Sequence, residues 1–168
     1  AHAAFWSVAN RTSWLFDFQG PSVSVDTACS SSLAAIHLAC ESIRRGECRA
    51  AIAGGVNLIL HPLHLVNLSQ LRMLAPGDQC RAFGAGANGF VDGEGVGAIL
   101  IRPLADALAA GDRIRGVILG PAMTSAGRTQ GYTVPNPLAQ ADLILDALEQ
   151  AEVDPATIQY VEAHGTGT

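Results

Sequence analysis

The chain has 168 residues, of which 49% are hydrophobic and 15% are charged, and its formal net charge is −5. This composition predicts one buried α/β domain, excludes a disordered chain and argues against a protein that grips nucleic acid. The four cysteines show no Cys-x-x-Cys spacing, which predicts a reducing compartment rather than a disulfide framework or a zinc site. The sequence contains no signal peptide and no apolar run long enough for a membrane span, so we expect a cytoplasmic protein.

The first predicted elements place a cysteine at the start of a helix. Residues 5–18 are typical of a helix that runs into a loop, and residues 20–25 alternate valine with serine, which predicts a short strand. A second helix is predicted from the N-capping serines Ser30–Ser32 to the Arg-Arg-Gly sequence at residues 44–46. Cys29 therefore lies at a helix N-terminus, where unpaired N–H groups and the helix dipole favour a thiolate and can bind an oxyanion. The alternative is an ordinary buried cysteine.

Two histidines follow the next predicted strand. Residues 49–53 predict a short buried strand closed by a glycine pair, and residues 65–71 predict a helix. His61 and His64 have the spacing of a metal-binding pair, but a third ligand is missing and the proline between them interrupts a regular helix. We therefore expect no metal site here.

A glycine-rich segment comes next. Residues 84–89 match the dinucleotide-binding pattern Gly-x-Gly-x-x-Gly. That pattern binds a pyrophosphate when it follows a strand and opens a helix. Here it leads into residues 93–101, which predict a strand, so the context is reversed. We expect no nucleotide binding and interpret these glycines as room for close backbone approach.

The second half of the chain predicts further helices and strands. The helices are predicted over residues 105–110 and 138–151, and the strands over residues 113–119 and 158–161. The loop over residues 124–137 is marked by glycine and proline. The last strand ends just before a histidine. Two strand ends, one before the cysteine and one before this histidine, can therefore meet at one edge of an α/β sheet.

Four motifs occur in the order found in one enzyme family. They are Asp26–Ser32 (DTACSSS), Ala53–Asn57 (AGGVN), Gly89–Gly97 (GFVDGEGVG) and Val161–Thr168 (VEAHGTGT). Together they resemble the β-ketoacyl synthase (ketosynthase) domains of modular type I polyketide synthases, and the similarity covers essentially the whole chain. Residues 131–137 (GYTVPNP) most resemble ketosynthases that receive their acyltransferase in trans. The family's domain is longer at both ends, so we expect an internal fragment.

The resemblance implies a thiolase-like α/β fold with five αβαβα layers, of which this chain would form a part. Residues 1–103 would belong to the N-terminal half, which carries the nucleophilic cysteine. Residues 104–168 would begin the C-terminal half and end after the first of the family's two histidine motifs.

The resemblance also implies the chemistry. Cys29 would accept an acyl group from a phosphopantetheine thioester, and its own backbone N–H would form part of the oxyanion hole. His164 corresponds to the first of two histidines that assist decarboxylation of a malonyl-type extender, and the second, with a lysine, is expected further along the protein. The other implied contacts are those of Thr166 and Thr168 with the pantetheine arm, of Thr133 as a further candidate in the same tunnel, and of Leu68 with the acyl chain.

Members of the family work with an acyl carrier protein, with an acyltransferase in cis or in trans, and as homodimers. We therefore expect these partners, no bound cofactor, and no nucleic-acid or membrane partner.

For Leu68, plain core packing is the alternative. A thiolase or a type III synthase is an alternative enzyme, which the cysteine and histidine motifs disfavour. The other alternative is a non-elongating ketosynthase-like domain that binds or transfers acyl chains. Cys29 excludes the variant of that kind that carries glutamine in its place.

Overall fold

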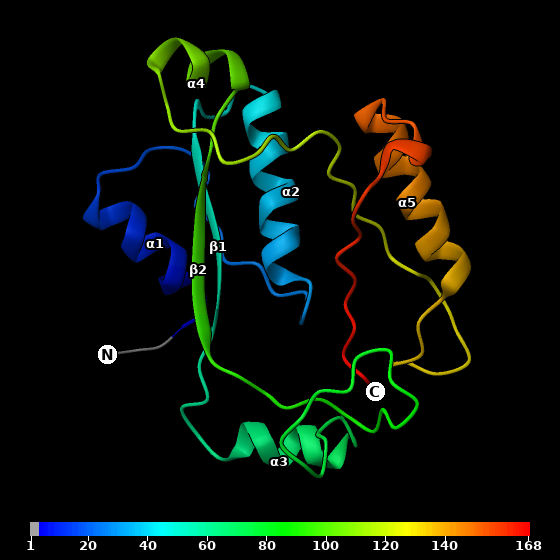
Figure 1. Cartoon of the computed structure of the whole chain (residues 1–168). Coiled ribbons are helices and arrows are strands. Elements are labelled where there is room, and N and C mark those ends of the chain that lie inside the picture. The colour runs from blue at the N-terminus through cyan, green and yellow to red at the C-terminus, as the bar shows by residue number, and fades with distance from the viewer. Residues whose placement is uncertain (1–3) are drawn as a thin grey trace. The chain divides into compact units, whose positions relative to one another are not determined.

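The computed structural model of the chain describes residues 4–168, which form a two-stranded sheet and five α-helices (Figure 1). The elements are α1 (Trp6–Leu15), α2 (Ser31–Arg44), β1 (Ala51–Asn57), α3 (Leu63–Gln70), β2 (Gly95–Ile101), α4 (Leu104–Ala110) and α5 (Pro137–Ala151), followed by a 3-10 turn (Pro155–Thr157). The chain forms two compact units. Unit 1 contains the residues up to Gly54 and Ala98–Thr157, and unit 2 contains Gly55–Gly97 and Ile158–Thr168.

The sheet pairs β1 with β2, and both strands contain two glycines. The prediction that the first strand closes at Gly54 and Gly55 is wrong, because β1 continues through both to Asn57. Neither glycine has a positive φ, so the backbone does not turn out of the sheet there. The hydrogen bonds of a sheet join backbone groups and need no side chain. The strand predicted after the glycine-rich segment is confirmed as β2.

The predicted helices are confirmed, and sequence signals explain several of their ends. α2 ends at Arg44, and Gly46 follows with a φ of 72°, as the Arg-Arg-Gly sequence predicts. α4 stops directly before Gly111, which has a φ of 70°. α5 begins after Asn136, whose side-chain oxygen accepts hydrogen bonds from two backbone N–H groups of the first turn, at 3.1 and 3.3 Å. None of the helices within residues 4–168 has the length and apolar character needed to cross a lipid bilayer.

In unit 1 the irregular stretch Leu119–Pro121 lies between α2 and α5 (Figure 1). From α2, the Arg44 guanidinium donates to the first carbonyl of this stretch at 3.4 Å, and His37 Nδ1 lies 3.0 Å from the last carbonyl. On the other side, a Cβ at Gly120 would overlap the backbone of α5. The helix that follows Cys29 is therefore connected to α5 through a close contact that requires glycine.

Three predicted strands are not found in the described part of the chain. Residues 20–25, 113–119 and 158–161 have no regular structure, so these predictions are wrong. The apolar patterns are present, but a strand also needs a neighbour that accepts and donates its backbone hydrogen bonds. Within residues 4–168 the only sheet is the pair of β1 and β2, and none of the three segments joins it.

Few side chains of the described residues are buried. The buried apolar residues are all small, namely Ala34, Cys40, Ala53 and Ala107. The accessible surface of the chain is 13242 Å², whereas a folded monomer of 17.4 kDa is expected to expose about 7,900 Å². Large side chains such as Trp14 and Phe83 are 84% and 85% exposed. Apolar surface of this extent is a surface for packing against further protein.

Candidate functional site

The chain enters α2 through a strained turn. Ala28, directly before Cys29, has a φ of 53°, in the left-handed region that residues with a side chain seldom adopt. Asp26 supports the turn, because its Oδ1 accepts a hydrogen bond from the backbone N–H of Ala28 at 3.2 Å. Such strain persists only where the surrounding structure maintains it, and it is concentrated at functional sites. Here it fixes the direction in which the next residue leaves the backbone.

Two serines fasten the same turn. Ser30 is the N-cap residue of α2, as predicted, but its hydroxyl donates back to the Thr27 carbonyl at 2.8 Å instead of accepting from a helix N–H. The Ser31 hydroxyl donates to the Ala28 carbonyl at 2.7 Å and accepts from the backbone N–H of Thr27 at 2.9 Å. The serines therefore hold the turn and leave the start of the helix uncapped.

The N–H groups at the start of α2 are consequently open. Among the described residues, no acceptor is present for the backbone N–H groups of Cys29, Ser32 and Leu33. Open N–H groups and the positive end of the helix dipole favour an anion at this place. An oxyanion formed by attack of Cys29 on a carbonyl group would need donors of this kind.

Cys29 differs from the other thiols in its surroundings. Its side chain is exposed, whereas Cys40 on the same helix is buried. Burial raises the pKa of the Cys40 thiol, and the nearby Arg44 guanidinium offsets part of this effect. Cys80 is also exposed, but it lies in a loop, where its sulfur accepts the N–H of Val91 at 3.1 Å. Of the four cysteines, Cys29 is the one beside a helix N-terminus.

Brief treatment of the complete, folded domain with limiting iodoacetamide is expected to label Cys29 before the other cysteines. The Cys29 thiol is accessible and lies beside open N–H groups that stabilise negative charge on the attacking sulfur, whereas the buried Cys40 is protected. Peptide mapping by mass spectrometry measures the order of labelling. Cys80 is the internal control, because it is exposed but lies in a loop. Faster labelling of Cys80 than of Cys29 would contradict the prediction.

In unit 2, the glycines of the histidine motif turn the chain against the loop of residues 81–89. Gly165 and Gly167 have φ values of 54° and 75°. A Cβ at Gly165 would lie 3.2 Å from the ring of Phe83, and a Cβ at Gly167 would lie 3.1 Å from the backbone of Arg81. The carbonyl of Gly167 accepts a hydrogen bond of 2.9 Å from the last N–H of this loop. Glycine therefore suits every second position of His-Gly-Thr-Gly-Thr, because at Gly165 and Gly167 the backbone has a positive φ and lies close to the loop.

The polar side chains of this motif are accessible. His164 is exposed, and the described residues offer its ring no hydrogen-bond partner. The hydroxyl groups of Thr166 and Thr168 lie 2.9 Å apart, so the structure brings these two predicted pantetheine contacts together. Cys29 belongs to unit 1 and His164 to unit 2. Their meeting in one catalytic site stays a prediction.

The two other predicted substrate contacts lie on separate elements. Thr133 is exposed in the loop before α5, and neighbouring residues of that loop line an open hollow of about 550 Å³. Leu68 is half-buried on α3. Their roles as contacts of the pantetheine arm and of the acyl chain also stay predictions.

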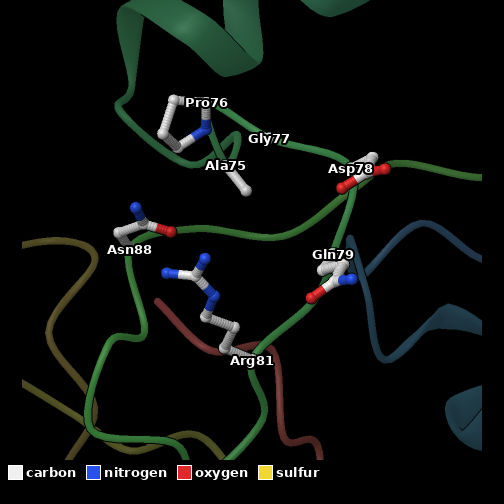
Figure 2. Close-up of a pocket in the computed structure, with 7 residues that line it drawn as sticks. All are labelled: Ala75, Pro76, Gly77, Asp78, Gln79, Arg81 and Asn88. Carbon is white, nitrogen blue, oxygen red and sulfur yellow. The ribbon is translucent and has the colours of Figure 1, made fainter.

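A second hollow, of about 290 Å³, opens in unit 2 at the loop that holds the histidine motif (Figure 2). The residues that line it are Ala75, Pro76, Gly77, Asp78, Gln79, Arg81 and Asn88. Figure 2 shows the Arg81 side chain reaching into the space beside Asn88, and its Nη1 donates to the Gly86 carbonyl at 3.2 Å. Asp78 lines the same hollow, and its negative charge opposes the positive charge of Arg81. The two charges together therefore give the hollow no preference for an anion. Neither hollow is lined by Cys29 or His164.

The metal-binding spacing of His61 and His64 is not matched by a shared ligand position, because the two rings have different partners. His61 Nδ1 accepts the backbone N–H of Leu63 at 3.1 Å, while His64 Nε2 lies 2.7 Å from Asp92 Oδ2. Within residues 4–168, no three or more metal-binding side chains come together.

Residues 84–89 form turns and lead to β2 with no helix between them, so the reversed context of this glycine pattern is confirmed.

Sequence analysis missed several residues that hold the two motifs in place. Asp26 and Ala28 carry the strained turn, and a signal for it existed, because closely spaced Asp, Thr and Ser residues bond to nearby backbone groups. Phe83 and Gly89 support the histidine motif. No local signal could reveal them, because the contacts join segments that lie far apart in the sequence.

Comparison with protein-family models matches residues 2–107 to the β-ketoacyl synthase N-terminal domain and residues 115–168 to the C-terminal domain. Among curated proteins, the chain is 60% identical to polyketide synthase PksM of Bacillus subtilis over 164 residues, which cover 98% of this chain and 4% of PksM. It is 52% identical to polyketide synthase ThaG of Burkholderia thailandensis over 162 residues, which cover 96% of this chain and 3% of ThaG. The chain thus spans a small part of the length of these relatives.

Solved structures with the same fold include the oxazolomycin ketosynthase domain OzmH KS7 of Streptomyces albus, with a TM-score of 0.97 and 49% identity. The match covers 100% of this chain and 30% of that one. The ketosynthase from module 6 of the bacillaene synthase of Bacillus subtilis has a TM-score of 0.95 and 43% identity, over 98% of this chain and 30% of that one. The predicted thiolase-like α/β fold is confirmed. The chain belongs to the β-ketoacyl synthase family and is a part of a ketosynthase domain like those of polyketide synthases.

Proposed function

We propose that the chain carries the nucleophile and the first catalytic histidine of a ketosynthase that extends polyketides by decarboxylative condensation. The observation that carries the proposal is the environment of Cys29, an exposed thiol on a strained turn beside open N–H groups of α2. In a member of the β-ketoacyl synthase family, this environment suits an acyl-accepting thiolate.

Cys29 performs the first half-reaction. Its thiolate attacks the carbonyl carbon of an acyl thioester carried on the phosphopantetheine arm of an acyl carrier protein. The carbonyl oxygen becomes an oxyanion, which the N–H groups at the start of α2 stabilise. When this intermediate collapses, the C–S bond to pantetheine breaks, pantetheine leaves as a thiolate that takes a proton from water, and the acyl group stays on Cys29 as a thioester.

His164 acts in the second half-reaction. A malonyl-type extender on the carrier protein loses carbon dioxide, and the electron pair of the broken C–C bond moves into a thioester enolate. His164 donates a hydrogen bond to the enolate oxygen, together with a second histidine that we place further along the protein. The enolate carbon then attacks the acyl group, the C–S bond to Cys29 breaks, and a β-ketoacyl thioester remains on the carrier protein.

Further residues of the chain bind the substrate. Thr166 and Thr168, whose hydroxyl groups lie 2.9 Å apart, hydrogen-bond the pantetheine arm, and Thr133 is a third contact with it. Leu68, half-buried on α3, contacts the acyl chain. The domain needs no cofactor of its own, because the phosphopantetheine arm arrives with the substrate.

The proposed partners are an acyl carrier protein, an acyltransferase in cis or in trans, and a second copy of the domain in a cytoplasmic homodimer. The accessible surface of 13242 Å² supports extensive packing against further protein. We place the two halves of the domain at residues 1–103 and 104–168.

A reconstituted assay tests the function. The complete domain is incubated with an acyl donor and a malonyl-loaded carrier protein, and the carrier is analysed by mass spectrometry. The expected product is a β-ketoacyl thioester on the carrier. The alternative, a non-elongating domain, would show an acyl group on Cys29 and exchange of acyl groups without this product. That outcome would overturn the condensation and leave Cys29 as an acyl acceptor.

A further inference from the structure

A histidine–aspartate pair joins α3 to the loop before β2. His64 Nε2 lies 2.7 Å from Asp92 Oδ2. The side chain of Asp92 is 13% exposed, whereas that of His64 is 41% exposed. A carboxylate with so little access to water depends on the hydrogen bonds that protein groups donate to it. The pair is therefore a structural connection and more than a surface contact.

Besides its contact with His64, Asp92 accepts a hydrogen bond from the last residue of β1. Asn57 Nδ2 donates to Asp92 Oδ1 at 3.3 Å and to the Gly93 carbonyl at 2.6 Å. Beside it, Glu94 Oε1 accepts the backbone N–H of Ile59 at 2.6 Å. The end of β1, the first turn of α3 and the loop before β2 are thereby fastened together around Asp92.

The same loop, residues 89–94, also contacts the segment that follows α3 and the histidine motif. Phe90 exchanges two backbone hydrogen bonds of 2.9 Å with the segment that follows α3. Gly89 donates its N–H to the Gly167 carbonyl, also at 2.9 Å. Within unit 2, this loop therefore contacts the first turn of α3, the segment that follows α3, and the motif that contains His164.

His64 and Leu68 lie on one face of α3. They are one helical turn apart, and they are the two half-buried residues of this helix, whose other residues are exposed. Any rotation or shift of α3 that moves His64 also moves Leu68. A bond that holds His64 therefore sets the place of Leu68.

We propose that the His64–Asp92 pair positions α3 as a wall of the acyl pocket and so determines which acyl chains fit. The inference rests on the proposed function, because Leu68 contacts substrate only if Cys29 accepts acyl groups. His64 and Asp92 are positioning residues, which act through α3 and do not touch the substrate. A long acyl chain needs the pocket wall in place, whereas an acetyl group does not reach it.

The test is the change Asp92→Leu in the complete domain, which removes both acceptor oxygens and keeps a side chain of similar size. Acylation of Cys29 by octanoyl- and acetyl-pantetheine thioesters is followed by intact-protein mass spectrometry. The second-order rate constant is expected to fall about tenfold for octanoyl and to stay within about twofold for acetyl. Asp92→Asn keeps an oxygen for Asn57 and an amide group for His64, so the wild-type ratio is expected to return.

Asp78→Leu is the matched control. Asp78 is an exposed aspartate of the same unit, and the described residues give it no ion pair. This change is expected to leave both rate constants unaltered. An unchanged ratio in Asp92→Leu, or an equal fall for both thioesters, would overturn the proposed role in chain selection.

Hydrogen exchange of the α3 amides, residues 63–70, separates this inference from the proposed function. Faster exchange is expected in Asp92→Leu and not in Asp92→Asn or Asp78→Leu. If the wild-type domain accepts no acyl group, the proposed function fails, while the exchange rates still decide whether the pair holds α3. Equal exchange in wild type and Asp92→Leu would refute the positioning role even in a domain that condenses normally.

Discussion

Cys29→Ala in the complete domain is expected to abolish acyl-enzyme formation and to lower the rate of condensation at least about a thousandfold. Alanine leaves the hydrogen bonds of Asp26 and Ser31 around the turn in place, because none of them uses the cysteine side chain. It removes the thiol that holds the acyl group. Intact-protein mass spectrometry measures the acyl-enzyme, and analysis of the carrier protein measures the condensation product.

Cys80→Ala is the matched control for this change. Cys80 is exposed like Cys29 but lies in a loop, so the control domain should acylate and condense at close to the wild-type rate. An acyl group that still attaches to the Cys29→Ala domain at the wild-type rate would place the nucleophile at another residue.

His164→Ala is expected to slow condensation by about a hundredfold to ten-thousandfold while acylation of Cys29 stays within a few-fold of wild type. The imidazole acts on the extender and its enolate, which enter after the acyl-enzyme has formed. Single-turnover measurements separate the two half-reactions. The first uses an acyl donor alone, and the second adds malonyl-loaded carrier protein to the preformed acyl-enzyme.

His61→Ala is the control for this split. His61 is an exposed histidine of the same unit, and its ring accepts a local backbone N–H at 3.1 Å. Both half-reactions should therefore keep their rates. A fall of acylation and condensation by the same factor in His164→Ala would show that the residue supports the fold and not the second step.

The helices could be predicted because their signals are local. The capping asparagine at residue 136, the Arg-Arg-Gly end of α2 and the glycine after α4 each mark a boundary in the sequence itself. Apolar residues at helical spacing then distinguish the interior of each helix from the loops. A helix satisfies its backbone hydrogen bonds within one segment, so local information is sufficient.

The strands were predicted less well for a related reason. β2 was found, but residues 20–25, 113–119 and 158–161 carry strand patterns without strand structure. Their apolar positions indicate which faces should be covered, and this information is local. The hydrogen bonds of a strand lie on a neighbouring segment, which a one-dimensional pattern does not identify.

The candidate site shows the same division. Cys29 and its place beside α2 were predictable, because a short motif followed by a helical pattern specifies both. The left-handed Ala28 was not, since alanine carries no preference for that conformation and is held in it by its neighbours. Asp92 was missed for a third reason. Its two partners, Asn57 and His64, lie on β1 and α3 and reach it only after these elements and the loop before β2 have come together.

The scarcity of buried side chains also bears on how the protein is made. Within residues 4–168 the buried apolar residues are three alanines and one cysteine, which withdraw little surface from water. A ribosome adds about 5–20 residues per second, so this segment takes roughly 10–30 s to emerge. During that time the aromatic side chains of α1 have no complete core to enter, and collapse with another nascent chain competes with folding. A chaperone that covered these aromatic side chains during synthesis would suppress the competing collapse.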